Sequence, residues 1–449
     1  MKSTMAAIRP FRALRYNPER ISDLSTVITQ PYDKISPAMQ SLYYDLSPYN
    51  LARIIRGRTA PEDNAENTVH TRAARDFQSW IKEGVLAAED EAAVYPYFQE
   101  YTIPGHASGV KERRGFIALC RLEDYSARIV HRHEETLSGP KADRMELLKR
   151  TRAHFGQVFF LYSDPSGQIE EALAPLTRRD PWEQLRDEYG TRHTVWRAAD
   201  AATIDRVVSG MRDRKLIIAD GHHRYETALA YRDLCRAEGH ECERAGYVMA
   251  TFVRMEASGL TILPTHRVVH GLPSFNWETF SEKAREAFDW NPLDSSPASA
   301  EGTAMIESKL RAAGRDRTAV AAYAGDGRLA LLTLKPGFGV AAALPGLSDA
   351  ERRLDVVVLH RLLIEHALSI SAQAVREEKN LRYVRELREA VEEVSTGRAQ
   401  VCFLMNSTPI EAVRDIAFGG RVMPQKSTDF YPKLLSGLTI YWLENPHGI

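Results

Sequence analysis

The densest group of residues able to do chemistry lies in the segment ADGHHRY, Ala219–Tyr225. An apolar run precedes it and a helical pattern follows, so a strand that stops at Asp220-Gly221 should pass directly into a helix. The start of a helix exposes backbone N–H groups, which bind anions. Gly221 would let the backbone approach a ligand, and Arg224 would offer donors to phosphate oxygens. The segment therefore predicts a phosphate-binding turn, with an ordinary helix cap at Asp220 as the alternative.

Two histidines follow this turn. His222 and His223 can donate or accept protons near neutral pH, so both are candidate catalytic residues together with Asp220. Metal binding by the pair is the weaker interpretation, because adjacent residues on a helix point about 100° apart. No second cluster of ligands has a metal-like spacing.

The segment MPQKSTDFYPK, Met423–Lys433, is the second candidate. Ammonium and hydroxyl groups that recognise phosphate or carboxylate are concentrated in it. They are Lys426, Ser427, Thr428 and Lys433. No glycine-rich run precedes them, which excludes a P-loop. We expect this loop to reach the same pocket as the ADGHHRY turn, although an exposed basic turn explains its residue types equally well.

An earlier segment, ITQPYDKIS, offers a general base. Asp33 follows the rigid Pro31-Tyr32 corner, where a carboxylate could accept the proton of a hydroxyl. We predict that Asp33 acts as the base, or orients a metal, and that Tyr32 contacts the substrate. A solvated turn is the alternative.

Two further segments carry candidate substrate-binding residues. HEETLSGPKADR contains Glu134, and LPTHR contains His266 and Arg267. Their charged and imidazole side chains suit contacts with a polar substrate. Asp143, in the first of these segments, also makes an ordinary helix N-cap, so a structural role stays open.

Mixed secondary structure must position these segments. Alternating apolar residues indicate strands, and apolar spacings of three and four indicate helices. The predicted strands cover residues 8–16, 93–103, 115–124, 158–162, 216–219, 247–255 and 401–406, with a hairpin over 318–336. The predicted helices cover residues 64–83, 143–154, 354–369, 380–396 and 410–418, with one more directly after Gly221. Residues 295–302 are expected to form a linker or exposed loop.

Composition restricts the class of protein. The chain has 449 residues, 44% hydrophobic and 27% charged, as in a soluble protein of two or three domains. A formal net charge of -1 provides no general basic field for nucleic acid or an anionic membrane. No run approaches the roughly 20 apolar residues of a membrane span. The amino-terminal segment also lacks the apolar stretch of a signal peptide.

The cysteines indicate a reducing compartment. Cys120, Cys235, Cys242 and Cys402 are sparse and form no C-x-x-C pair. Neither a disulfide framework nor a zinc ribbon is supported, and we predict a cytoplasmic protein.

Taken in order, PYDKIS, HEETLSGPKADR, ADGHHRYETAL, LPTHR and MPQKSTDFYPKLLSG resemble the prokaryotic family called domain of unknown function ten-fifteen. The resemblance extends from about Ile8 to Gly437, and the family name carries no activity. ADGHHRY is also similar to the Asp-Gly-His-x-Arg turn of the ParB/sulfiredoxin-like fold. Members of that fold include nucleotide-binding proteins and kinases that phosphorylate free serine. In those kinases the turn holds nucleotide phosphates, and an acidic residue from an earlier loop activates the substrate hydroxyl.

The resemblance implies a mixed α/β (α+β) fold with a ParB/sulfiredoxin-like core and a mixed sheet. Residues 1–271 would form this core, residues 272–350 a small αβ module, and residues 351–449 a helical region whose strand and KST loop pack on the core. The phosphate role would be carried by Asp220, Gly221, His222, His223 and Arg224. Asp33 is assigned as the base by its position alone.

The implied activity is that of a phosphotransferase. It would use ATP or ADP with Mg²⁺ to phosphorylate the hydroxyl of a small metabolite, free serine being the first candidate. One alternative is a hydrolase of a phosphorylated small molecule, with His222 or His223 as nucleophile or acid. Another is a nucleotide-binding regulatory protein of the ParB kind, although the near-neutral charge argues against direct DNA binding. We therefore expect a small-molecule substrate, no nucleic acid and no membrane as partners, and the sequence allows a homodimer.

Overall fold

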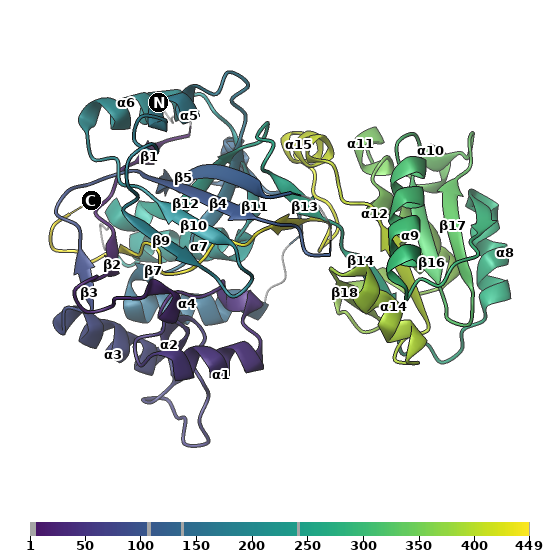
Figure 1. Cartoon of the computed structure of the whole chain (residues 1–449), viewed down its shortest axis with the longest axis horizontal. Helices are drawn as coiled ribbons and strands as arrows, with labels where there is room; N and C mark the ends of the chain where they lie inside the picture. The colour runs from purple at the N-terminus through teal and green to yellow at the C-terminus, as the bar shows by residue number, and fades with distance from the viewer. Residues whose placement is uncertain (1–5, 106–108, 136–138, 240–242, 449) are drawn as a thin grey trace. The chain divides into compact units, whose positions relative to one another are not determined.

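The computed structural model describes residues 6–105, 109–135, 139–239 and 243–448. The chain forms two compact units (Figure 1). Unit 1 comprises Met1–Arg132, Thr136–Thr261 and Pro432–Ile449, and unit 2 comprises His133–Glu135 and Ile262–Tyr431. The last residues thus return to unit 1 after the chain has built unit 2. Cys242 and residues 136–138 of the HEETLSGPKADR segment lie outside the described residues.

Unit 1 is built on a mixed sheet that has nine strands in the described residues. Their order is β6-β11-β8-β12-β5-β4-β10-β9, with β1 paired to β5. The pairs β6–β11 and β8–β12 are parallel, and the other pairs are antiparallel. The strands are β1 (Ile8–Arg9), β4 (Tyr95–Tyr101), β5 (Lys111–Arg121), β6 (Val130–His131), β8 (Val158–Tyr162), β9 (Glu183–Arg186), β10 (Arg192–Val195), β11 (Leu216–Asp220) and β12 (Tyr247–Arg254). Two short antiparallel pairs accompany the sheet: β2 (Leu14–Tyr16) with β3 (Leu86–Ala88), and β7 (Ala153–His154) with β21 (Tyr441–Trp442).

The central strands of this sheet are apolar along their length because both faces are covered. Every residue of β8 is buried, as is every residue of β12 before Arg254. Phe160 and Phe252 belong to a cluster that also contains side chains of α5 (Gln168–Leu173), α6 (Ala201–Met211) and α7 (His222–Ala237). The strand β11 therefore ends at the border of a packed core, which fixes the place of the residues that follow it.

Helices of several lengths cover unit 1. In Figure 1, α5 and α6 lie above the large sheet and α1 to α4 lie below it. The remaining helices are η1 (Leu24–Thr26), η2 (Tyr32–Lys34), α1 (Pro37–Leu46), α2 (Ala52–Ile55), α3 (Val69–Lys82), η3 (Tyr125–Ala127), α4 (Gly139–Thr151) and η4 (Glu243–Gly246).

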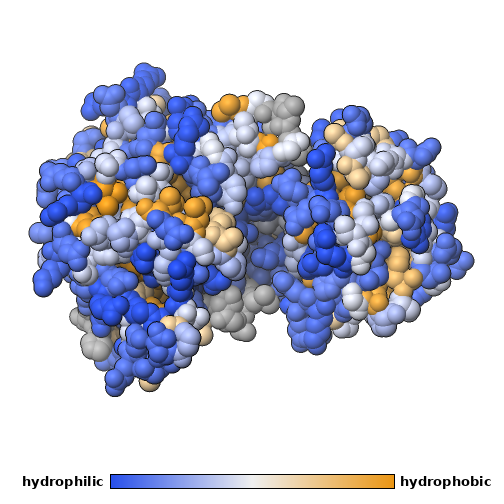
Figure 2. Space-filling model, turned by 60° about the horizontal axis from the view of Figure 1, so that its bottom comes forward, coloured by the Kyte–Doolittle hydropathy of each residue, from blue (hydrophilic) through white to orange (hydrophobic). Residues whose placement is uncertain are grey.

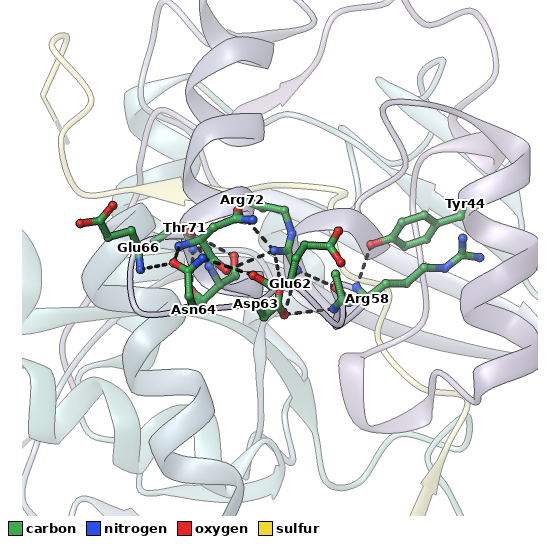
Figure 3. A network of polar contacts seen from close by, with 11 residues as sticks. Tyr44, Arg58, Glu62, Asp63, Asn64, Glu66, Thr71 and Arg72 are labelled. Carbon is green, nitrogen blue, oxygen red and sulfur yellow. Dashed lines mark hydrogen bonds and ion pairs between the residues drawn. The ribbon is translucent and has the colours of Figure 1, made fainter.

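A polar network holds the loop between α2 and α3 (Figure 3). Arg72 on α3 donates to Asp63 at 2.5 Å and to the carbonyl of Arg58 at 2.8 Å. The N–H of Arg58 in turn donates to the hydroxyl of Tyr44 on α1, at 3.1 Å. The loop is thus held to α3 through Arg72 and to α1 through Tyr44, by side-chain and backbone groups.

Unit 2 has its own sheet, six-stranded in the described residues, in the order β15-β17-β16-β19-β14-β18. Every pair in it is antiparallel. The strands are β14 (His266–Val269), β15 (Phe288–Pro292), β16 (Ala319–Tyr323), β17 (Leu329–Leu334), β18 (Leu381–Val384) and β19 (Val401–Met405). A separate pair joins β13 (Thr261–Leu263) to β20 (Asp429–Tyr431).

Helices cover both faces of this second sheet. Ile306 of α9 (Ala300–Ala313) and Val391 of α14 (Leu387–Ser395) pack in one cluster with Leu404 of β19. Phe280 of α8 (Trp277–Ala287) packs on the neighbouring residue Phe403, with ring centroids 5.8 Å apart. Successive side chains of a strand point to opposite faces, so α8 lies opposite α9 and α14. The other helices are α10 (Val340–Ala343), α11 (Asp349–Arg352), α12 (Asp355–Val358), the π-helix η5 (Leu359–Ala367), α13 (Ala372–Arg376) and α15 (Ile410–Phe418).

Several sequence predictions are confirmed. The fold is mixed α/β with a large mixed sheet. The strand over residues 158–162 and the helix over 410–418 match β8 and α15. The hairpin expected over residues 318–336 is formed by β16 and β17.

Other predictions need correction. The helix expected over residues 380–396 is wrong at its start, because Leu381–Val384 pair with β14 as the strand β18. The strand expected over residues 8–16 is divided between β1 and β2, which pair with different partners. The helix expected over 354–369 is mostly a π-helix, and α9 begins inside the stretch expected to be a loop. Residues 272–350 and 351–449 were expected to form separate regions, yet strands from both share the unit 2 sheet.

The surface is mainly polar on the face shown in Figure 2, where apolar residues form small patches. Cys120, Cys235 and Cys402 are free, buried thiols. Within the described ranges, no helix is long and apolar enough to cross a membrane.

Candidate functional site

The predicted strand-to-helix turn is present at the carboxyl end of β11. Gly221 takes the N-cap position of α7 with φ +88°, a left-handed conformation that favours glycine. A Cβ at this position would also lie 3.0 Å from Arg224 Nε. The Gly221 N–H donates to Asp220 Oδ1 at 2.7 Å. Asp220 therefore holds the turn from outside the helix, and the alternative of Asp220 as the helix cap is wrong.

Cations gather around the Asp220 carboxylate. Lys433 Nζ lies 3.2 Å from Asp220 Oδ2, and Arg224 Nη2 lies 3.8 Å from Asp220 Oδ1. Burial alone would raise the pKa of Asp220, but the charges of Lys433, Arg224 and Lys34 hold that pKa well below its usual range. Asp220 is therefore ionised near neutral pH. We call this group, Asp220 with Lys34, Arg224 and Lys433 at the start of α7, the turn cluster.

Buried polar side chains place Lys433 in the turn cluster. Arg113 Nε donates to Gln99 Oε1 at 2.9 Å, and Gln99 Nε2 donates to the Lys433 carbonyl at 2.9 Å. Arg113 also donates to the carbonyl of Pro432. Arg113 and Gln99 are each only 1% exposed, and burial lowers the pKa of Arg113 to about 10. This arrangement fixes the backbone that carries Lys433, so its ammonium reaches Asp220 from a distant part of the sequence.

The Pro31-Tyr32 corner stands beside the same turn. The Arg144 guanidinium lies 4.1 Å from the centre of the Tyr32 ring. Burial and the charge of Asp33 raise the pKa of Tyr32, whereas the charges of Arg224 and Arg144 lower it. Asp33 itself is exposed in the short helix η2. A carboxylate that is open to solvent beside the Tyr32 corner is a suitable candidate for the predicted base.

A small cavity of about 60 Å³ opens between this corner and α7. Its walls come from distant segments of unit 1: Pro31, Tyr32, Ile55, Arg144, Leu147, Leu148, Ala153, His154, Phe155, Gly156, Arg224, Thr227 and Ser436. Arg224 also donates to the carbonyl of Gln157. The cavity and the turn cluster thus share the Arg224 side chain.

The two predicted catalytic histidines occupy the first turn of α7. His222 and His223 are both half-buried, next to the N-cap glycine. No group of three or more His, Cys, Asp or Glu in the described part of the chain could hold a metal ion. The pair therefore lies at the start of α7, and its catalytic and phosphate-binding roles stay predictions.

A second network of predicted residues lies in unit 2. Glu134 Oε1 accepts the Lys426 N–H at 2.7 Å, and His133 Nε2 lies 2.8 Å from Thr428 Oγ1. Ser427 is 6% exposed, and its hydroxyl donates to the Pro424 carbonyl. Lys426 has φ +58°, and its side chain is exposed without an ion pair among the described residues. We call this group the KST network.

Arg267 holds the backbone of the KST network in place through buried hydrogen bonds. Its Nη2 donates to the Lys426 carbonyl at 3.0 Å, and its Nε donates to His360 Nε2 at 3.2 Å. Arg267 is 1% exposed, and burial lowers its pKa to about 10. His266 Nδ1 accepts the Met405 N–H at 3.1 Å, and burial followed by the charge of Arg267 lowers the pKa of His266 to about 3. Both side chains are thus buried and hydrogen-bonded within unit 2, and their predicted substrate contacts stay a prediction.

One half-buried carboxyl in unit 2, that of Asp355, has neutral surroundings. Asp355 accepts hydrogen bonds from the Thr318 side chain, the Ala319 N–H and the Asn406 side chain. Burial raises the pKa of Asp355 to about 7, and these neutral donors lower it only in part. Asp355 stands at the start of α12 and was not singled out by the sequence.

The predicted site residues thus divide between the two units. Unit 1 contains Tyr32, Asp33, Asp220, Gly221, His222, His223, Arg224 and Lys433, and unit 2 contains Glu134, His266, Arg267, Lys426, Ser427 and Thr428. A joint site of the turn cluster and the KST loop stays a prediction. Sequence reasoning missed two residues that position the turn cluster, Gln99 and Arg113.

Comparison with known proteins identifies the family. A family model described as Protein of unknown function (DUF1015) matches residues 8–357, so the chain belongs to this family. The match ends before the MPQKSTDFYPK segment, to which the sequence resemblance extended. A search of curated proteins gave no match.

Distant solved structures are similar over much of the chain. A conserved hypothetical protein from Pyrococcus furiosus is 11% identical, with a TM-score of 0.35, over 73% of this chain and 96% of that one. A free serine kinase in complex with AMP is 12% identical, with a TM-score of 0.34, over 72% and 92%. SbnI from Staphylococcus aureus, truncated at its C-terminus, is 9% identical, with a TM-score of 0.33, over 73% and 87%. Likenesses at this level carry no argument about activity.

Proposed function

We propose that this member of the DUF1015 family is a phosphotransferase that moves a phosphoryl group from ATP or ADP to the hydroxyl of a small metabolite. The observation that carries the proposal is the turn cluster. Arg224 and Lys433 converge at the N-terminus of α7, where backbone N–H groups and the helix dipole already favour an anion. Phosphoryl transfer requires mainly positioning and neutralisation of charge, which this group of residues can supply.

The charge balance of the turn cluster suits nucleotide phosphates. Asp220 neutralises part of the charge of Lys433, Arg224 and Lys34, and an excess of positive charge is left. Asp220 also limits the motion of the Arg224 and Lys433 side chains. Their conformational entropy is therefore lost when the protein folds and not when the ligand binds. Mg²⁺ would arrive with the nucleotide as its complex and neutralise further phosphate charge.

We assign the general base to Asp33. In the proposed step Asp33 accepts the proton of the acceptor hydroxyl, and the acceptor oxygen forms a bond to the terminal phosphorus. The bond from that phosphorus to the bridging oxygen breaks, and ADP leaves from ATP, or AMP from ADP. Arg224 and Lys433 hold the oxygens whose charge increases during transfer. Free serine is the first candidate acceptor.

The direct test is an assay for new phosphorylated species. The full-length protein is incubated with ATP or ADP, Mg²⁺ and a panel of hydroxyl metabolites, and products are followed by phosphorus NMR. A phosphorylated metabolite formed together with ADP or AMP supports the proposal. Release of inorganic phosphate from phosphorylated metabolites without nucleotide would replace it with the hydrolase, and nucleotide binding without turnover would replace it with the regulatory protein.

Two variants test the assigned roles. Arg224→Ala should lower nucleotide affinity by about 1.5–3 kcal/mol, the contribution of a charge-assisted hydrogen bond. The exposed Arg212 of the same unit offers Arg212→Ala as the matched control, with unchanged affinity. Asp33→Asn should lower turnover by roughly 100-fold or more with little change in affinity. Asp213→Asn, at another exposed position, should leave turnover unchanged.

A further inference from the structure

Three buried threonine hydroxyls of unit 1, those of Thr29, Thr191 and Thr227, have no hydrogen-bond partner among the described residues, and Thr227 is the one that lines the cavity. Thr227 on α7 is 4% exposed, and its Oγ1 has no hydrogen-bond partner among the described residues. Buried hydroxyls are nearly always hydrogen-bonded, because leaving one unsatisfied costs about 1–3 kcal/mol. The Thr227 side chain therefore needs an explanation outside the contacts that stabilise the fold.

Thr227 lines the same cavity as Arg224. The two residues are three positions apart on α7, which places them on one side of the helix. Ser436 contributes a second hydroxyl to the cavity wall, and Tyr32 brings the corner that carries Asp33. The cavity thus lies between the proposed phosphate-binding group and the proposed base, where the acceptor of a phosphoryl group must be held.

The chemistry of the wall selects an anion of one charge. Two guanidinium groups, those of Arg144 and Arg224, line the cavity, and the described lining holds no carboxylate. Both are already engaged in part, Arg144 with Asp143 and with the Ile55 carbonyl, and Arg224 with the Asp220 carboxylate and the Gln157 carbonyl. The donors that remain on this wall suit a singly charged carboxylate, while the phosphate oxygens are assigned to Arg224 together with Lys433 and the N-terminus of α7.

The size of the cavity restricts what can enter. A water needs about 10–15 Å³ of such space, so about 60 Å³ corresponds to roughly four to six positions of that size. A carboxylate with its α-carbon and one substituent has this size, whereas an aromatic ring or a nucleoside does not. Leu147 and Phe155 on the wall provide an apolar surface for the carbon atoms.

We infer that this cavity binds the carboxylate end of a small acceptor and that the Thr227 hydroxyl donates a hydrogen bond to it. This inference rests on the proposed phosphotransferase function and deepens it, because it makes Thr227 a residue that determines acceptor specificity. Arg224 then contacts both substrates, and the acceptor hydroxyl extends from the cavity toward Asp33.

The test compares Thr227→Val with Thr227→Ser in the full-length protein. Valine keeps the shape of threonine without the hydroxyl, and serine keeps the hydroxyl. Binding of L-serine, D-glycerate and glycolate is measured by calorimetry with and without ADP, and ethanolamine serves as the probe without a carboxylate. We expect the wild type to bind at least one of the carboxylate probes and to prefer it to ethanolamine. Thr227→Val should weaken that binding about 3- to 10-fold, Thr227→Ser less than about 2-fold, and ADP affinity should not change in either variant.

Stability provides a second readout. Removal of an unsatisfied buried hydroxyl should leave the melting temperature of Thr227→Val unchanged or raise it. Lower stability with unchanged probe binding would show that the hydroxyl is structural and overturn the inference. Binding of ADP without any of the three carboxylate probes would overturn it as well. Failure of the wild type to bind ADP would instead contradict the proposed function. Even then, carboxylate binding that is lost in Thr227→Val but kept in the wild type and in Thr227→Ser would support the subsite.

Discussion

The turn cluster of unit 1 and the KST network of unit 2 use similar residues in different ways. In the turn cluster, the side chains of Arg224 and Lys433 meet the Asp220 side chain at a helix start. In the KST network, the charged groups of Arg267 and Glu134 bond to the backbone of Lys426. In the turn cluster the charged groups converge at the start of α7, whereas in the KST network they hold the backbone of the loop that carries Lys426.

This difference shows how to separate a binding group from a scaffold when the residue types are alike. Backbone carbonyl and N–H groups cannot leave their partners, so Arg267 and Glu134 are committed to the folded loop. Arg224 also donates to the Gln157 carbonyl, but its contact with Asp220, like that of Lys433, joins two side chains and can be exchanged for a ligand oxygen at little cost. Spatial partners are therefore more informative about function than the motif in which a residue stands.

Two carboxyl groups extend the comparison. Asp220 lies among cations and has a lowered pKa, whereas Asp355 lies among neutral donors and has a pKa raised by burial to about 7. A lowered pKa adds stability above the unfolded value near 3.8, and that stability is lost as the pH falls through the folded pKa. A raised pKa has the opposite sign, so Asp355 makes unit 2 less stable as the pH rises from about 4 to 7.

The largest effect is expected at Asp355. Its shift from 3.8 to about 7 corresponds to about 4 kcal/mol of unit 2 stability lost between these pH values. Asp355→Asn cannot ionise, so this part of the pH dependence should disappear in the variant. Hydrogen exchange of the β16 and β19 amides at pH 4, 5.5 and 7 measures it. The exposed Asp349 provides the control Asp349→Asn, and equal pH dependence in both variants and the wild type would contradict the prediction.

The next largest effect is expected at Arg267. Arg267→Met leaves the carbonyls of Thr265 and Lys426 and the His360 ring without their donor. We expect the free energy of unfolding to fall by about 3 kcal/mol, with ADP affinity unchanged. Urea unfolding and calorimetry provide the two measurements, and Arg361→Met at an exposed position of unit 2 is the control. A loss of ADP affinity in folded Arg267→Met would remove the distinction between scaffold and binding group.

A tenfold effect is expected at Lys433. Lys433→Ala removes a cation from the proposed phosphate site, and ADP affinity should fall about 10-fold, or about 1.4 kcal/mol. Lys433→Arg keeps the charge and should stay within about 3-fold of the wild type. Calorimetric titration distinguishes the three proteins, and equal affinities would exclude Lys433 from the binding group.

The smallest effect is expected at Lys426. Its left-handed backbone disfavours any residue with a Cβ, so Lys426→Gly should raise the free energy of unfolding by about 0.5 kcal/mol. Lys426→Ala keeps that backbone penalty and should change stability by less than about 0.5 kcal/mol. ADP titration of Lys426→Ala sharpens the comparison, because a tenfold loss of affinity would bring the KST loop into the phosphate site, as the sequence predicts.

Local patterns were predictable and distant partners were not. The β11 turn and α7 follow from an apolar run, an Asp-Gly pair and helical spacing within about twenty residues. Arg113 stands in the run KERR, which has the composition of a solvated strand end, and its burial depends on Gln99 and on residues 432–433. The error at residues 381–384 has the same origin, because pairing with β14 decides their conformation. Long-range pairing left no periodic signal in the sequence.

The return of the chain to unit 1 has a consequence for biosynthesis. Lys433 and Ser436 belong to the last segment, Pro432–Ile449, which a ribosome makes after all of unit 2. The three residues that hold Lys433 in place are synthesised some two hundred residues or more earlier, and they are Gln99, Arg113 and Asp220. A nascent chain therefore has the α7 turn without Lys433, and the turn cluster can be completed only after the whole of unit 2 has been synthesised.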